Sequence, residues 1–184
     1  YITYNQFNLV TFAYEGIVIL ELVKADIYAL AGTTLYNRKA LTNLHDASLA
    51  MSIQPAQMRT YGGSMYFVDS AVFGGNFFTL WKLTGPPDAS ALSAFDVAIT
   101  AYASPPDMAQ PNATLVDAGD CRIQDAVYAS GKLYAAFTRN NAGVPTVQTQ
   151  QIDVVTLASN GAFIGGSESK TYPAIDIDEN DQIT

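Results

Sequence analysis

The fold is decided by residues 64–84, which read SMYFVDSAV, then FGG, then NFFTLWKLT. Residues 64–72 and 76–84 are both rich in β-branched and aromatic side chains, and Gly74 and Gly75 lie between them. Two such runs around a glycine turn are typical of an antiparallel β-hairpin. We therefore predict a hairpin over residues 64–84, in which Trp81 is largely buried.

Related patterns occur on both sides of this hairpin. Residues 126–138 form a second strand–glycine–strand run around Gly131, and residues 95–102 alternate with a period of two. The remaining strand-like runs are residues 1–4, 17–23, 147–156, 162–164 and the two halves of a hairpin over 173–184. The sequence therefore predicts a chain built almost wholly from β-strands.

Three segments depart from the strand pattern. Residues 24–31 contain Ala and Leu and precede Gly32, so they favour one or two helical turns with a glycine cap. Residues 33–52 are predicted to be irregular, with Asn and Asp as turn formers. Residues 104–112 contain three prolines, which lack the backbone N–H that a central strand needs. We expect this last segment to be a loop.

A repeat of the strand pattern suggests the architecture. The order of short strand, turn, aromatic strand, turn and alternating strand occurs clearly around 53–102 and again around 123–164. Repeats of about 40 to 70 residues with four strands each are typical of propeller blades. We predict an all-β fold with propeller-like antiparallel blades, and a β-sandwich is the alternative.

The same interpretation sets the domain organisation. Residues 1–184 would form a single all-β unit of about three blades and the start of another. Because a propeller closes with about four to eight blades, this unit would be a partial propeller. We therefore expect either a longer natural chain or a second copy that covers the open blade faces.

Composition excludes several classes of protein. Of the 184 residues, 49% are hydrophobic, which is too many for a disordered chain. The net charge of -8 repels nucleic-acid backbones and anionic lipid heads, so from charge alone we expect neither a nucleic-acid partner nor membrane-surface binding. No apolar run approaches the 18 residues or so that cross a membrane. Cys121 is the only cysteine and His45 the only histidine, so neither a disulfide nor a zinc site is expected.

The acidic residues near the end of the chain are the best candidate for a metal site. Asp176, Asp178, Asn180 and Asp181 place oxygen ligands at nearly alternate positions, and Ile183 follows them. This pattern matches the first half of a calcium loop, although Asp181 stands where such a loop needs glycine. The turn preference of Asp and Asn explains the same residues as the acidic tip of a hairpin. Calcium is thus the one predicted ligand ion, and no cofactor or catalytic set is predicted.

Carboxylates also gather before the second hairpin. Asp117, Asp120 and Asp125 surround Arg122 and Gly119. Paired carboxylates could perform acid–base chemistry in a glycosidase if they faced each other across a cleft. An Asp–Arg pair that orders the loop explains the residues equally well. The aromatic residues have two explanations as well: they could form a sugar platform or core packing. They are Tyr66, Phe67, Phe77, Phe78, Trp81, Tyr102, Tyr128 and Tyr134.

These features resemble a group of exported bacterial proteins. The resemblance begins with Tyr1-Ile-Thr-Tyr-Asn-Gln-Phe7 and extends over nearly the whole chain. The other matching positions are Ile17 to Leu22 with Lys24, Tyr66 to Ser70, Leu80 to Thr84, Tyr102, Pro105-Pro106, Gln110-Pro111, Asp117, Gly119-Asp120, Arg122, Ala126 to Tyr128, Gly131 to Leu133, and Tyr172 to Ala174. Proteins of this group are secreted or surface-located, and they look like β-propellers of the sialidase-like kind. The sialidase arginine triad and its Ser-x-Asp-x-Gly-x-Thr-Trp box have no counterpart here, so the resemblance does not imply sialidase activity.

Together these observations lead to one expected function and two alternatives. We expect an exported or cell-surface module that binds a protein or glycan partner through loops between strands. The first alternative is part of a glycan-active hydrolase whose catalytic residues lie outside residues 1–184. The second is a self-assembling surface or filament subunit, which would pair strand edges between copies.

Overall fold

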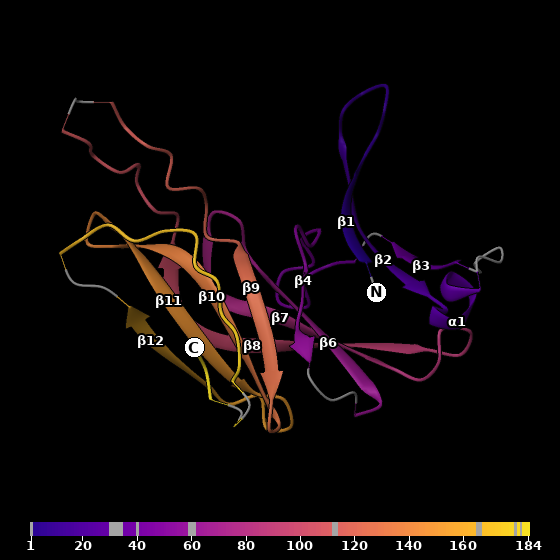
Figure 1. Cartoon of the computed structure of the whole chain (residues 1–184). Helices are drawn as coiled ribbons and strands as arrows, with labels where there is room; N and C mark the ends of the chain where they lie inside the picture. The colour runs from indigo at the N-terminus through magenta and orange to yellow at the C-terminus, as the bar shows by residue number, and fades with distance from the viewer. Residues whose placement is uncertain are drawn as a thin grey trace.

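The computed structural model describes residues 2–29, 35–39, 41–58, 62–111, 114–164, 167–178, 180 and 182–184. Within them the fold is all-β, as predicted, with a single short helix, α1 (Lys24–Tyr28). The strands form three separate sheets, and none of the sheets closes on itself (Figure 1). In this described part of the chain, no helix is long and apolar enough to cross a bilayer.

The first sheet contains β1 (Ile2–Phe7), β2 (Tyr14–Leu22) and β3 (Leu35–Lys39), in that order and all antiparallel. β3 corrects, for residues 35–39, the prediction of an irregular segment over residues 33–52. Its sequence LYNRK is a weak strand signal, and its pairing with β2 supplies the order that its own residues do not. Residues 41–52 are irregular as predicted, with turns and an isolated bridge between Thr42 and Leu49. Helix α1 ends at Tyr28, earlier than the predicted residue 31, and residues 30–31 lie outside the described part of the chain.

The second sheet contains β4 (Gln54–Pro55), β6 (Ser64–Ser70), β7 (Gly74–Thr84) and β8 (Ala91–Ala103), ordered β4-β6-β7-β8. The predicted hairpin is confirmed, since β6 and β7 pair antiparallel from Ser64↔Thr84 onward. Gly74 begins β7 with φ +117°, and a Cβ there would lie 2.5 Å from the Tyr102 carbonyl oxygen of β8. The glycine is therefore required by the close approach of two strands as well as by the turn.

The third sheet contains β5 (Gln57–Met58), β9 (Ile123–Ala129), β10 (Lys132–Asn141), β11 (Val144–Asp153) and β12 (Ser159–Ile164). Its order is β12-β11-β10-β9-β5. The predicted hairpin around Gly131 is the β9–β10 pair. β5 follows β4 of the second sheet closely in sequence and pairs parallel with β9, so the chain crosses between the two sheets at this point.

Apolar clusters join the sheets in chain order. Ile17 and Ile19 of β2 pack with Phe67 and Trp81 of the β6–β7 hairpin, which holds the first sheet against the second. Trp81 is only 2% exposed, as the sequence predicted. The cluster between the second and third sheets contains Tyr66, Val68, Phe78, Leu80, Val97 and Tyr102 on one side and Ile123, Ala126, Leu133, Ala135, Phe137 and Ile152 on the other.

The segment after β12 packs on the remaining face of the third sheet. Ile175 and Ile177 bury against Val127, Ala129 and Ala136. The predicted terminal hairpin is present as a short antiparallel bridge between Ile177 and Ile183, and paired backbone hydrogen bonds flank the bridge. Each sheet thus has an apolar face covered by the element that follows it in the chain.

Candidate functional site

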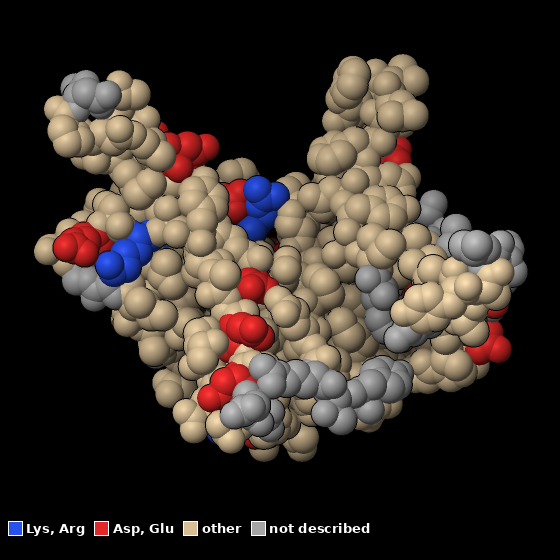
Figure 2. Space-filling model, viewed as in Figure 1, with Lys and Arg blue, Asp and Glu red and all other residues tan. Residues whose placement is uncertain are grey.

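A polar cleft of about 620 Å³ opens where the second and third sheets meet. β4 and β9, the loop before β9, and the segment after β12 all contribute to its walls. In the space-filling view, a basic and an acidic group meet between two projecting parts of the molecule (Figure 2). The lining residues are Ser52, Gln54, Asp117, Gly119, Asp120, Arg122, Ile123, Gln124 and Tyr172.

Arg122 is fixed inside this cleft by two neighbours. Its Nε donates to Asp120 Oδ2 at 2.7 Å, and its Nη1 donates to Ser52 Oγ at 2.8 Å. The backbone N–H of Arg122 also donates to Asp120 Oδ1 at 2.9 Å. The hydrogen bond that the guanidinium donates to Asp120 raises the pKa of Arg122 above its usual value, so Arg122 stays charged. The predicted Asp–Arg pair is therefore present, and it orders the loop before β9.

Tyr172 forms the aromatic wall of the cleft. Its ring lies against Gly119, because a Cβ at Gly119 would be 3.1 Å from the Tyr172 hydroxyl oxygen and 3.4 Å from two ring carbons. The hydroxyl donates to the Asp117 carbonyl oxygen at 3.3 Å. Gly119 itself has φ +76°, and its N–H donates to Asp117 Oδ1 at 2.7 Å. A tight Asp–glycine turn thus leaves room for the ring and anchors its tip.

Tyr172 holds its place at a conformational cost. Its φ is +53°, a left-handed conformation that bulky side chains seldom adopt. Its N–H donates to Thr138 Oγ1 at 3.2 Å, and 59% of the residue is exposed. Strained backbone of this kind costs on the order of 1–3 kcal/mol and tends to gather at ligand sites. An exposed aromatic ring held in this way is a feature of a binding site more than of a core.

The carboxylates predicted near Arg122 do not all meet. Asp117 and Asp120 line the cleft, whereas Asp125 fastens the segment after β12. Asp125 Oδ2 accepts from the Ile175 N–H at 3.0 Å, and its Oδ1 accepts from Gln57 Nε2 at 3.2 Å. Asp125 therefore stands apart as a structural link, and Asp117 and Asp120 are each committed to a hydrogen bond within their own loop.

Of the four residues of the predicted calcium site, the structure describes Asp176, Asp178 and Asn180. Asp178 Oδ1 accepts from the N–H groups of Asn180 and Gln182, both at 2.8 Å. Asp176 Oδ1 accepts from the Ile177 N–H at 2.7 Å, and Asp181 lies outside the described residues. Among the residues that the structure describes, no three His, Cys, Asp or Glu side chains gather around a point that could hold a metal ion. The acidic hairpin tip explains these contacts, and calcium binding stays a prediction.

The predicted aromatic set lies mainly in the core. Tyr66, Phe67, Phe77, Phe78, Trp81 and Tyr102 are all buried. Tyr128 is half-buried and stacks on Tyr66 at a centroid distance of 4.8 Å. Core packing therefore accounts for most of this set. The aromatic wall of the cleft comes instead from Tyr172, which stands in a polar segment before Pro173 and carries no signal that marks it as a ligand-binding residue.

Three other reactive groups lie outside the cleft lining. Cys121 is buried, and desolvation raises the pKa of its thiol, so it behaves as an inert core residue. His45 stacks on Phe77 at 4.3 Å, and its Nδ1 lies 2.9 Å from Asp96 Oδ2 at the surface. Asp69 is almost fully buried, and desolvation raises the pKa of its carboxyl to about 7.

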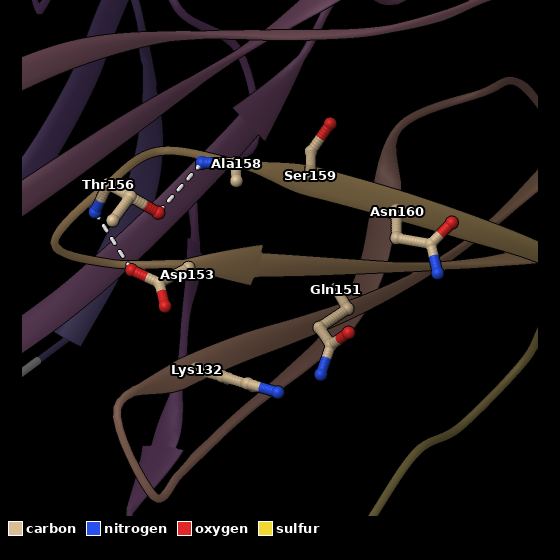
Figure 3. A pocket seen from close by; sticks show the side chains of 7 residues that line it. All are labelled: Lys132, Gln151, Asp153, Thr156, Ala158, Ser159 and Asn160. Carbon is tan, nitrogen blue, oxygen red and sulfur yellow. Dashed lines mark hydrogen bonds between the residues drawn. The ribbon is translucent and has the colours of Figure 1, made fainter.

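A second hollow of about 240 Å³ lies at the end of the third sheet (Figure 3). Asp153 closes the turn between β11 and β12, where its Oδ1 accepts from the Thr156 N–H at 2.8 Å. Thr156 Oγ1 in turn accepts from the Ala158 N–H at 3.3 Å. The remaining lining residues are Lys132, Gln151, Ser159 and Asn160, so this hollow has no aromatic wall. Because Asp153 stabilises the turn and no aromatic ring lines this hollow, the Arg122 cleft is the better candidate for a ligand-binding site.

Comparison of the chain with family models, with curated proteins and with solved structures found no match. The resemblance to exported propeller proteins accordingly stays a prediction from the sequence.

Proposed function

We propose that this chain is an exported, cell-surface β-propeller-like module that binds a neutral glycan in the Arg122 cleft. The observation that supports this proposal most strongly is the exposed ring of Tyr172, which Gly119 and Asp117 hold beside a row of polar side chains. Binding, rather than catalysis, is the function that this geometry supports best.

The propeller part of the proposal has support from strand order and packing. Strands β6, β7 and β8 form an antiparallel meander with β4, and strands β9 to β12 form another. Four-stranded meanders of this kind are the unit of a propeller. Successive sheets pack through apolar faces in chain order, as neighbouring blades do. A β-sandwich accounts less well for the separate three-stranded sheet that precedes them.

The glycan part of the proposal follows from the chemistry of the lining. Sugar hydroxyls both donate and accept hydrogen bonds, so they need acceptors such as Asp117 and donors such as Arg122 in one site. The side-chain amides of Gln54 in β4 and Gln124 in β9 can each donate and accept a hydrogen bond. The aromatic face of Tyr172 offers an apolar surface for the C–H groups of a sugar ring. The volume of about 620 Å³ lies within the range of small-ligand sites.

The charge balance of the cleft favours a neutral ligand. Arg122 is already paired with Asp120, and Asp117 adds a further negative charge. A strongly anionic ligand would meet these carboxylates and the net charge of -8. A neutral polyol is not repelled by these charges.

The hydrolase alternative has less support from the same residues. Acid–base hydrolysis of a glycoside needs two carboxylates that face a substrate from opposite sides. Asp120 is bound by Arg122, and Asp117 caps the Gly119 turn. The self-assembly alternative rests on a different feature: β12 is an exposed outer strand with the uncharged sequence SNGAFI. Edges without Lys or Pro can pair with another chain.

The proposal is tested by screening residues 1–184 on an array of neutral oligosaccharides, including cello-, malto-, manno- and chito-oligomers. We expect binding to at least one series, and we expect the Gln54→Ala/Gln124→Ala variant to lose that binding. Gln151→Ala, a change in the second hollow, serves as the matched control and should bind like the parent. If the Gln54→Ala/Gln124→Ala variant still binds and the Gln151→Ala variant does not, the ligand binds outside the Arg122 cleft. If the parent binds no oligosaccharide on the array, the proposal is rejected.

A further inference from the structure

The β1–β2 hairpin ends in an uncharged tip that is almost entirely exposed. Residues 2–14 contain no Asp, Glu, Lys or Arg. Leu9, Val10 and Phe12 are 90%, 85% and 80% exposed. The hairpin projects from the body of the molecule (Figure 1), and its end carries no acidic or basic side chain (Figure 2). Three large apolar side chains are thus presented together to the surroundings.

The tip is ordered by its own hydrogen bonds. Asn8 Oδ1 accepts from the N–H groups of Val10 and Thr11 at 2.9 and 3.0 Å. The Asn8 carbonyl oxygen accepts from the Phe12 N–H at 2.9 Å, and the Asn8 N–H donates to the Ala13 carbonyl at 2.8 Å. Phe12 adopts a φ of +55°, which is rare for a bulky residue. The turn therefore holds the apolar side chains outward in spite of local strain.

The shape and charge of the tip indicate what it contacts. A narrow convex tip needs a matching apolar cavity on a protein partner, whereas a fluid lipid layer needs none. Phe7 and Tyr14 lie behind the tip with ring centroids 5.5 Å apart, and the amphipathic ring of a tyrosine prefers the level of the lipid headgroups. The first charge, Glu15, accepts hydrogen bonds from Gln6 and Asn8 at the base of the turn.

We propose that Leu9, Val10 and Phe12 insert into the interface of a zwitterionic lipid bilayer. Residues 2–14 contain no Lys or Arg, and the chain has a net charge of -8, so anionic lipids offer no added attraction. A second copy is a poorer occupant because it carries the same net charge. The insertion is shallow and reversible, since three side chains bury little apolar area compared with a spanning helix.

A second projection supports contact with a flat surface. The loop between β8 and β9 extends to the same side of the molecule as the hairpin (Figure 1). The antiparallel bridge between Met108 and Val116 joins the two arms of this loop, and Leu115 beside that bridge is 60% exposed. The Arg122 cleft lies between the bases of the two projections. On the hairpin side, Ser52 forms hydrogen bonds with both Asn5 of β1 and Arg122. On the loop side, Asp117 lines the cleft directly after the Met108–Val116 bridge.

The test is co-flotation of residues 1–184 with phosphatidylcholine vesicles in 150 mM salt. We expect the parent to float with the vesicles and Leu9→Ser/Phe12→Ser to remain in the dense fraction, with the same melting temperature. The matched control, Phe73→Ser/Val155→Ser, changes two side chains that are both 85% exposed on other turns and should float like the parent. Replacing a third of the lipid with phosphatidylserine should not increase flotation.

Three results would overturn the inference. The parent could fail to float, or the control could lose flotation as fully as the tip variant does. Alternatively, light scattering could show a dimer that dissociates in the tip variant while neither protein floats, which would make a second copy the partner. None of these outcomes depends on the glycan cleft, so the two proposals stand or fall separately.

Discussion

Replacing Trp81 with alanine should remove much of the attachment between the first and second sheets. The side chain is 2% exposed and packs with Ile17, Ile19 and Phe67. A buried aromatic of this size covers on the order of 150–250 Å², worth about 4–6 kcal/mol at 25 cal/mol per Å². Large aromatic truncations in cores cost about 3–5 kcal/mol, and we expect a loss in that range. For a chain of this length, the melting temperature should fall by about 6–20 °C.

The assay is thermal and urea unfolding followed by circular dichroism. Phe73→Ala, at the exposed turn of the same hairpin, is the control and should change stability by about 0.5 kcal/mol or less. Amide exchange gives a second readout, because Trp81→Ala should speed exchange in β2 more than in β10, which belongs to a different cluster. A variant that melts within about 2 °C of the parent would refute the packing between these two sheets.

Three further predictions concern a buried carboxyl, a glycine and the metal candidate. Burial raises the pKa of Asp69 to about 7, so the folded state keeps a proton that the unfolded chain releases above about pH 4. Stability should therefore fall by about 3 kcal/mol between pH 4 and pH 7, and Asp69→Asn should flatten that slope in pH-dependent urea melts; an unchanged slope would contradict the assignment. Gly74→Ala should cost more than Gly131→Ala, since both glycines have positive φ but only Gly74 faces a backbone atom at 2.5 Å; equal melting temperatures would argue against the close β7–β8 approach. If calcium binds at the terminal hairpin, a hundredfold excess over its Kd should stabilise the fold by about 2.7 kcal/mol relative to chelator, and Asp178→Asn should abolish this gain; identical melts with calcium and with chelator would leave only the hairpin-tip explanation.

The strands that the sequence predicted best are those with strong local signals. The β6–β7 and β9–β10 hairpins each combine apolar runs with a glycine turn, so the register follows from contacts between near neighbours. β3 was missed because its order depends on β2 rather than on its own residues. The parallel pair of β5 and β9 joins residues about 70 positions apart, which no local pattern encodes.

The candidate site was predictable in part, for the same reason. Asp117, Asp120 and Arg122 are close in sequence, and an Asp–Arg pair, which the structure shows between Asp120 and Arg122, was one of the two predicted explanations. Ser52 and Tyr172 reach the cleft from distant segments, through the stacking of the second and third sheets. A tyrosine in a loop gives no indication of a left-handed backbone or of a glycine beneath its ring.

The glycan proposal is tested most directly by calorimetric titration of the best oligosaccharide from the array into the parent, Tyr172→Phe and Tyr172→Ala. The ring contact predicts that Tyr172→Phe binds nearly as well as the parent, because it loses only the hydroxyl that donates to Asp117. Tyr172→Ala should bind about tenfold more weakly or worse, which corresponds to a loss of about 1.4 kcal/mol or more. Equal affinities for the parent and Tyr172→Ala would show that the ring does not contact the ligand and would contradict the account of this cleft.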